Sequence, residues 1–318
     1  MVPVLFIIAL VLKFAFISNP IQHPPPSSGG MLEKWIFNIW WKEASPGVLA
    51  AFAITIIFLS GLYLNFLLNN KRMYPRSNLL MALSFIIFTS LFPGLQHMHA
   101  GIVMMPLAIL LFRYLLVLYN TPKPKTAVVN IGMVVGIGTL LYHPYWWMLP
   151  YCFLGLAIMR PFRLNEWVLL VVSFLVPAYI LLSYEFLTNQ WNPMAHWPVW
   201  NPQTEWPPFN GYWAAALILA AIWVLSGFNQ WQISNRRMLI QTRKNWYLLL
   251  LLGLFTLPSL FFPKGNLFEG LSLLLLPASA LASNAFLGEQ KPTMKTLFFW
   301  ILMVAAAIFS WATLTNKM

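Results

Sequence analysis

Acidic residues are scarce in this sequence. All seven of them are glutamates, because the 318 residues contain no aspartate. Charged residues make up only 8% of the chain, whereas hydrophobic residues make up 60%. A soluble fold needs more polar surface than this composition supplies. Few acidic residues fall inside the predicted helices, which argues against an ion-coupled transporter, since such proteins carry carboxylates within the membrane.

Cysteine is nearly absent as well. The single Cys152 lies in a predicted helix, so the chain cannot form an intrachain disulfide, and we expect a small buried side chain there. The His-Glu-x-x-His pattern of zinc enzymes does not occur. The histidines lie at predicted helix ends rather than in facing pairs within helices, which disfavours a cytochrome. We therefore expect no cofactor.

Long apolar runs dominate the rest of the chain. They are continuous rather than alternating, which favours helices over a transmembrane barrel. Runs of about 17–25 residues can cross a bilayer core of about 30 Å. We predict an all-α transmembrane helix bundle, a single integral membrane domain over residues 1–318. Its eleven spans cover about residues 2–18, 46–68, 78–94, 101–119, 127–142, 146–159, 165–184, 211–228, 246–262, 268–286 and 296–314.

The spans at 127–142 and 146–159 are separated by His143-Pro144, and the second of them is short. These two could instead form a broken or re-entrant pair within the bundle.

Lysine and arginine are distributed unevenly among the predicted loops. If the N-terminus is cytoplasmic, thirteen of these residues fall in cytoplasmic loops and four fall outside. Basic residues are retained on the cytoplasmic side, so this asymmetry predicts an internal N-terminus and an external C-terminus. The net charge of +12 then follows from topology and attraction to anionic lipid, and no nucleic-acid partner is needed.

The first predicted outer loop, residues 19–45, begins with a proline-rich and glycine-rich linker. Apolar residues then recur at helical spacing over residues 31–43, which predicts a helix lying in the membrane interface. Its tryptophans could simply anchor it at headgroup level. In the functional alternative, the helix forms one wall of a site and carries Glu33 or Glu43 towards a polar headgroup.

The second predicted outer loop, residues 185–210, is rich in proline and tryptophan. Prolines exclude a regular helix, and the low charge is unlike that of a disordered tail, so we expect an ordered cap. Its aromatic rings could stack on sugars, line a lipid entrance or form an interfacial belt. The loop carries His196, Trp197 and Trp200.

The short outer turns carry histidines and aromatic residues. His97 and His99 lie in one turn, and His143 precedes Trp146 and Trp147 in another. Imidazole groups are ligands and proton carriers near neutral pH. These residues are candidates for hydrogen bonding to a phosphate or hydroxyl ligand. The alternatives are ordinary interfacial histidines, or a zinc site assembled across separate loops.

A few charged residues lie within or beside the predicted spans. Arg113 either extends to the nearer interface or faces the interior and pairs with a carboxylate or phosphate. Glu185 and Glu269 lie at outer helix ends, and we expect both to reach one outer cavity. Glu166 lies at the inner end of its span, where we expect it to pair with Arg163 or to cap its helix.

Several segments carry a family resemblance. The segments are Leu64-Asn65, the turn Asn70-Lys71-Arg72 with the stretch from Pro75 to Leu80, and the stretch from Arg160 to Trp167 ahead of Val176-Pro177. They resemble an uncharacterised family of polytopic inner-membrane proteins from Bacteroidetes-type bacteria. The resemblance is clearest over residues 45–190. It implies a bacterial inner-membrane, cell-envelope setting and carries over no site.

A looser resemblance is to membrane glycosyltransferases of the GT-C type, which have many helices, an interfacial helix in the first outer loop and an outer aromatic cavity. Those enzymes use a carboxylate of that loop, usually aspartate, and take sugar from a polyprenyl-phosphate carrier. The resemblance implies that Glu33 or Glu43 is the general base on an acceptor hydroxyl. Arg113 or a histidine would stabilise charge on the leaving phosphate.

The competing hypothesis is a non-enzymatic scaffold or anchor subunit of an envelope assembly for secretion or polysaccharide export. In that case Trp197 and Trp200 are the candidate contacts with a protein partner, because large aromatic residues dominate binding energy at interfaces.

Overall fold

The computed structural model describes residues 45–92, 95, 98–189, 211–261, 267–287 and 292–314, together with Ile7, Ile8, Val11 and Leu32. Within these residues the regular structure is helical, without a strand. The helices are α3 (Pro46–Asn70), α4 (Leu80–Leu91), α5 (Ala100–Val117), α6 (Lys125–Leu141), η3 (His143–Trp147), α7 (Met148–Met159), α8 (Leu164–Leu187), α9 (Gly211–Asn235), α10 (Ile240–Thr256), η5 (Leu257–Leu260), α11 (Leu267–Ser283), η6 (Asn284–Phe286) and α12 (Pro292–Leu314).

Five helices in the described part of the chain are long and apolar enough to cross a membrane. They span Gly47–Asn70, Ala100–Val117, Leu164–Leu187, Trp213–Asn235 and Leu267–Phe286. This confirms the predicted all-helical fold and its membrane character. The predicted interfacial helix at 31–43, apart from Leu32, and the predicted span at 2–18, apart from Ile7, Ile8 and Val11, lie outside the described residues.

Two helices extend beyond the apolar runs from which they were predicted. Helix α9 continues to Asn235 rather than ending near residue 228, and α10 begins at Ile240 rather than near residue 246. Arg243 and Lys244, predicted to lie in a loop, are therefore in the first turns of α10. An α-helix satisfies its own backbone hydrogen bonds, so it can continue into a polar environment after its apolar part ends.

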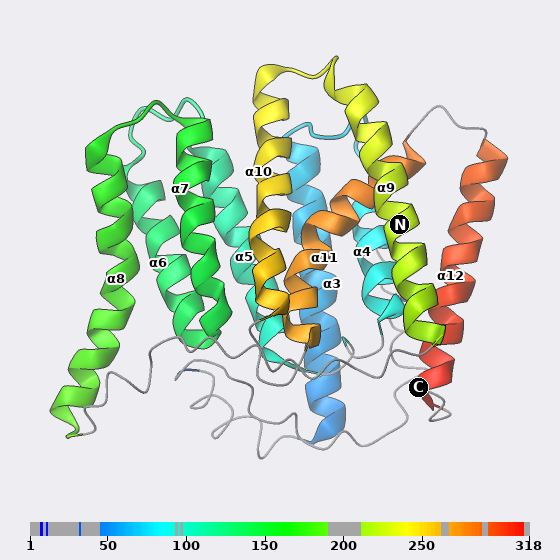
Figure 1. Ribbon diagram of the computed structural model, residues 1–318, viewed down its shortest axis with the longest axis horizontal. Helices are drawn as coiled ribbons and strands as arrows, with labels where there is room; N and C mark the ends of the chain where they lie inside the picture. Colours follow the sequence, from blue (N-terminus) through cyan, green and yellow to red (C-terminus); the bar gives the residue numbers. More distant parts are fainter. Residues whose placement is uncertain are drawn as a thin grey trace.

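Consecutive α-helices run in opposite directions through the bundle (Figure 1). Helices α3, α5, α7, α9 and α11 end at the upper end of the view, where the following helix begins. Helix α8 lies at one edge of the bundle and α12 at the other, whereas α11 lies between them. Helix α11 is mostly buried and packs against α4, α5, α9 and α10.

Aromatic rings join the helices around this centre. The fully buried Trp223 of α9 stacks on Phe88 of α4, with ring centroids 4.4 Å apart. Trp246 of α10 is also fully buried, and its ring lies 6.0 Å from that of Trp231 on α9. Offset and edge contacts of this kind add to the stability given by burial alone.

Helices α6 and α8 pack closely because two glycines of α6 face α8. A Cβ atom on Gly132 would lie 2.8 Å from the backbone oxygen of Leu170, and a Cβ atom on Gly136 would lie 2.5 Å from that of Phe174. Small residues spaced four apart let membrane helices approach to backbone contact. This Gly-x-x-x-Gly pair therefore determines how α8 joins the bundle.

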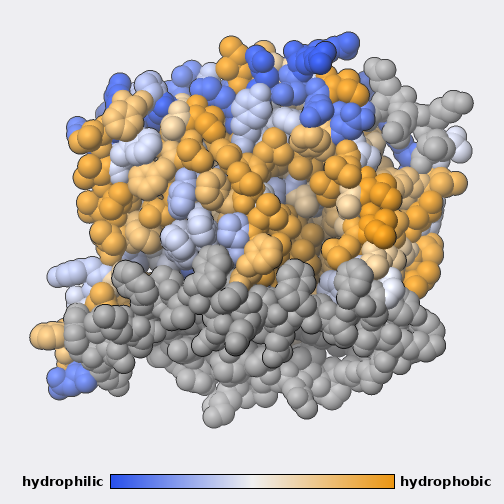
Figure 2. Space-filling model, viewed as in Figure 1, coloured by the Kyte–Doolittle hydropathy of each residue, from blue (hydrophilic) through white to orange (hydrophobic). Residues whose placement is uncertain are grey.

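The basic residues of the described chain are concentrated at one end. Every described lysine and arginine belongs to the connections at the upper end of Figure 1 or to the helix turns beside them, and Arg113 lies one turn further in. Figure 2 shows these hydrophilic residues above a broad apolar band. We refer to the end where α3 ends and α4 begins as the basic end, and to the other as the opposite end.

Candidate functional site

The predicted site residues divide into two groups. Glu33, Glu43, His97, His196, Trp197 and Trp200 lie outside the described residues, so their predicted roles stay predictions. The structure places His99, Arg113, His143, Trp146, Trp147, Glu185 and Glu269.

His99 and Glu269 lie on helix ends that are in contact at the opposite end of the bundle. His99 precedes α5 as its N-cap residue, with 3% of its surface exposed, and Glu269 lies in the first turn of α11 with 2% exposed. Helices α5 and α11 are in contact here, because a Cβ atom on Gly101 would lie only 2.8 Å from the Cα atom of Glu269. Two ionisable side chains are thus buried on contacting helix ends.

The turn that carries His143 is a short 3₁₀-helix, η3, between α6 and α7. Tyr145 of this turn is fully buried and packs against Gly138 of α6, while the rings of Trp146 and Trp147 lie 4.6 Å apart. His143 is partly exposed. The turn also packs against η5, which follows α10, so it lies within the bundle rather than apart from it.

Glu185 belongs to a different part of the opposite end. It lies near the end of α8 and is 3% exposed. Helix α8 packs against α6 at the edge of the bundle, whereas α11, which carries Glu269, is central (Figure 1). The two glutamates are therefore on separate sides of α6, and their predicted meeting in one cavity has no support from the packing of these helices.

Arg113 lies on the exposed side of α5, nearer the basic end than the opposite end. Its Nη1 atom donates a hydrogen bond of 2.8 Å to the hydroxyl oxygen of Tyr63 on α3. The structure thus separates Arg113 from the buried His99 and Glu269.

Of the two roles predicted for Glu166, the pairing with Arg163 is wrong, whereas its place in the first turn of α8 agrees with the alternative role at the helix N-terminus. Its Oε2 atom lies 3.1 Å from Nε of Arg160, and these side chains are 8% and 9% exposed respectively. Arg160 also donates a hydrogen bond of 2.5 Å to the backbone oxygen of Thr121. Arg163 is the exposed N-cap residue of α8, so its side chain lies in solvent while Arg160 folds inward beneath the α5–α6 connection.

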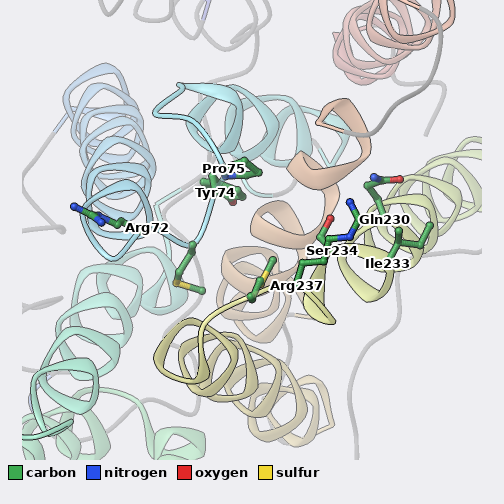
Figure 3. Close-up of a pocket in the computed structure, with 9 residues that line it drawn as sticks. Arg72, Tyr74, Pro75, Gln230, Ile233, Ser234 and Arg237 are labelled. Atoms are coloured by element: carbon green, nitrogen blue, oxygen red, sulfur yellow. The ribbon is translucent and has the colours of Figure 1, made fainter.

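A pocket of about 860 Å³ opens at the basic end, between the turn that follows α3 and the last turns of α9. Tyr74 and Pro75 lie on one side, facing Gln230, Ser234 and Arg237 on the other (Figure 3). In the sequence, the basic residues of this pocket indicated only the topology. The available signal was the pair of basic turns, after α3 and after α9, but nothing local indicates that they meet.

Among the described residues, no group of three or more histidine, cysteine, aspartate or glutamate side chains could hold a metal ion.

Comparison with known proteins gives a family but no activity. A family of unknown function (DUF6427) matches residues 36–318, so the chain belongs to this family. No curated protein and no solved structure matches the chain. The family agrees with the expected uncharacterised family of similar length, whereas the bacterial source and the resemblance to GT-C glycosyltransferases stay predictions.

Proposed function

We propose that this member of the family is a protein of the bacterial inner membrane that crosses the membrane eleven times, with its basic end in the cytoplasm. The observation that carries the proposal is the gathering of every described lysine and arginine at that end. Basic residues of short loops are retained on the cytoplasmic side of the membrane.

The direction of the helices supports the number of spans. Helix α3 ends at the basic end and α5 begins at the opposite end, so the chain must traverse the bundle through α4. The same argument applies to α10, which connects the end of α9 to the start of α11. Helices α4, α6, α7 and α10 therefore act as crossings between the five long helices.

The lateral surface of the bundle is also suited to contact with lipid. Helices α8 and α9 expose large apolar side chains along their length, including Leu175, Tyr179, Ile218 and Leu225, each more than half exposed. In water such a surface would drive aggregation, whereas in a bilayer it costs nothing to expose.

Topology can be tested by labelling introduced cysteines from outside the cell. We expect Ser27→Cys to react and Ser234→Cys, beside the basic end, to be protected. The native Cys152 is fully buried and should not contribute to labelling of the folded protein. Labelling of Ser234→Cys with protection of Ser27→Cys would invert the proposed orientation.

At the outer end we propose chemistry on a lipid-linked glycan, by transfer of sugar from a polyprenyl-phosphate carrier. The burial of His99 and Glu269 on contacting helix ends supports a site there, since ionisable groups inside a membrane protein are costly and are usually retained for function. Glu33 or Glu43 would act as general base, and a histidine would stabilise the leaving phosphate.

This chemistry can be tested by Glu33→Gln, Glu43→Gln and Glu269→Gln in cells. We expect loss of the base, Glu33 or Glu43, to slow glycan modification by a factor of about 10²–10⁴ while the protein stays inserted in the membrane. Glu269→Gln should slow it as well, because it removes the buried carboxylate of the proposed site. Glu205→Gln in the second outer loop is the matched control. Normal envelope glycans in all three variants would contradict an enzymatic role.

The second candidate is a membrane scaffold for an envelope assembly, favoured by the wide exposed apolar face of α8 at the edge of the bundle. A scaffold would tolerate the glutamine substitutions. It would instead lose a co-purifying envelope protein in Trp197→Ala or Trp200→Ala.

A further inference from the structure

The pocket at the basic end combines positive charge with a size suited to a small ligand. Its volume of about 860 Å³ falls within the range of about 300–1,000 Å³ that is usual for small-molecule sites. Arg72 and Arg237 line it, from the turn after α3 and the turn after α9 respectively. Ser234 and Gln230 of α9 add side chains that can donate hydrogen bonds.

The described glutamates do not neutralise these two arginines. Glu166 forms its ion pair with Arg160, and the remaining described glutamates, Glu185 and Glu269, lie toward the opposite end of the bundle. Within the described part of the chain, the pocket therefore carries an excess of positive charge that an anionic ligand would balance.

The side of the pocket formed by Tyr74 is held in place by hydrogen bonds and is uncharged. The hydroxyl of Tyr74 donates a hydrogen bond of 3.1 Å to the backbone oxygen of Ala280 and lies 2.7 Å from Oγ of Ser283. Burial raises the pKa of the Tyr74 hydroxyl well above its usual range, and the hydrogen bond with Ser283 offsets part of that rise. The Tyr74 side chain is therefore neutral at physiological pH and does not repel an anion.

The backbone of the adjacent turn is held in place as well. The indole Nε1–H of Trp246 donates a hydrogen bond of 3.2 Å to the backbone oxygen of Met73. The N–H groups of Arg72 and Met73 each donate a hydrogen bond of 3.0 Å, to the backbone oxygens of Asn69 and Leu68. These two bonds form a Schellman motif at the end of α3.

Arg72 occupies the position of this motif that usually belongs to glycine. Its φ of 51° lies in the left-handed region, which costs free energy for a residue with a Cβ atom. An arginine at such a position sacrifices local stability and supplies a guanidinium group at the rim of the pocket.

We propose that this pocket binds a phosphate group, with Arg237 as its main ligand and Ser234 and Gln230 as further donors. A guanidinium group binds phosphate through two parallel hydrogen bonds, which makes arginine well suited to this role. In Figure 3 the guanidinium of Arg72 is turned away from the other lining residues. It would contribute by rotating over the bound ligand.

The position of the pocket indicates where the phosphate comes from. Ile233 lines the pocket, is 60% exposed, and continues the exposed apolar side of α9 that includes Leu225. Met73 and Met238 add further apolar lining. A lipid of the adjacent leaflet could thus place its phosphate between the arginines and its glycerol and acyl groups against these side chains, whereas a soluble phosphate compound would use the polar part alone.

The proposal can be tested with the full-length protein in detergent, by titration with phosphatidylglycerol or phosphatidylcholine and native mass spectrometry of the complexes. We expect phosphatidylglycerol to bind preferentially, because its headgroup has a net negative charge, whereas the choline group of phosphatidylcholine neutralises its phosphate. Arg237→Gln should weaken this binding about tenfold or more, the usual effect of losing a hydrogen bond between charged groups. Arg72→Gln should have a smaller effect.

Arg236→Gln is the matched control, since it removes the same charge from the neighbouring residue, which does not line the pocket. Ser234→Ala provides a second test that leaves the net charge unchanged and should weaken binding as well. Unchanged thermal unfolding of each variant will show that it is folded. Equal weakening by Arg236→Gln, or no weakening by Arg237→Gln and Ser234→Ala, would overturn the proposal in favour of general attraction to the basic end.

Competition separates the two sources of phosphate. If inorganic phosphate displaces the lipid from the wild-type protein but competes more weakly in Arg237→Gln, the pocket accepts a free phosphate group. If inorganic phosphate does not displace the lipid, the ligand is a lipid headgroup. Neither outcome depends on chemistry at the outer end, so this proposal and the proposed function can fail separately.

Discussion

The close contact between α6 and α8 provides a sharp test of the structure. Gly136→Ala adds a Cβ atom 2.5 Å from the backbone oxygen of Phe174, 2.9 Å from Cγ of Pro177 and 3.1 Å from its Cδ. Real Cβ atoms essentially never approach other atoms within 3.0 Å. The nearest obstacle is backbone, which cannot rotate away, so the two helices must move apart.

Two effects of opposite sign determine how much Gly136→Ala changes the free energy of unfolding. Overpacking of a close contact costs about 1–3 kcal/mol. Replacing a glycine inside a helix by alanine gains about 0.5–1 kcal/mol, because alanine loses less conformational entropy. The rigid backbone obstacle puts the cost near the upper end of its range. We therefore expect Gly136→Ala to lower the free energy of unfolding by about 2–2.5 kcal/mol.

The assay uses the single native cysteine. Cys152 is fully buried in α7, so a thiol reagent should modify it only when the protein unfolds. The free energy of unfolding in detergent micelles follows from the modified fraction as denaturant increases. Gly47→Ala, in the first turn of α3, is the control, because nothing lies within 4 Å of its added Cβ atom.

A Gly136→Ala variant that is as stable as the wild type, or more stable, would refute the close packing of α6 on α8. The same result would remove the reason for the Gly-x-x-x-Gly spacing of Gly132 and Gly136.

Three further predictions concern buried polar groups and the cysteine. Glu166→Gln should destabilise the protein by about 3 kcal/mol, because it leaves the charge of Arg160 largely buried without its carboxylate. In chemical unfolding, the double variant Arg160→Met and Glu166→Leu should recover most of this loss. A loss in the double variant equal to the sum of the two single losses would contradict a direct ion pair. Tyr74→Phe should cost only about 0.5–1.5 kcal/mol, because Ser283 still donates its own hydrogen bond to Ala280. Burial raises the pKa of Tyr74 in the folded protein. The stability that depends on neutral Tyr74 is therefore retained below the unfolded pKa of about 10 and is lost as the pH rises above it. Tyr74→Phe removes this ionisable group and should reduce the fall in stability measured at alkaline pH. Cys152 should resist maleimide in the folded protein, and rapid labelling without denaturant would show that α7 is not packed as described.

The sequence predicted the helices well where the prediction depended on local properties. Continuous apolar length and helical backbone bonding are properties of a single segment, so the ranges of α3 to α12 agree with the predicted spans within several residues. The largest errors were the end of α9 and the start of α10, where helix continues into polar sequence. Those polar turns carry Gln230 and Ser234, which explains why the pocket was missed.

The candidate sites were predicted less well, because they depend on which segments meet. The burial of His99 and Glu269 on contacting helix ends, the place of Glu185 on the peripheral helix α8, and the pairing of Glu166 with Arg160 all result from helix packing. A sequence places charged residues near helix ends, but it does not specify which helix ends become neighbours.

The sequence by itself thus determined that this protein is a bundle of apolar helices with its positive charge at one end, since hydrophobicity and charge act along each segment separately. Only the tertiary structure decided that Arg72, Tyr74 and Arg237 line one pocket, and that Gly132 and Gly136 face α8. The physical reason is that contacts between distant segments depend on the shapes of both surfaces, and neither segment contains that information alone.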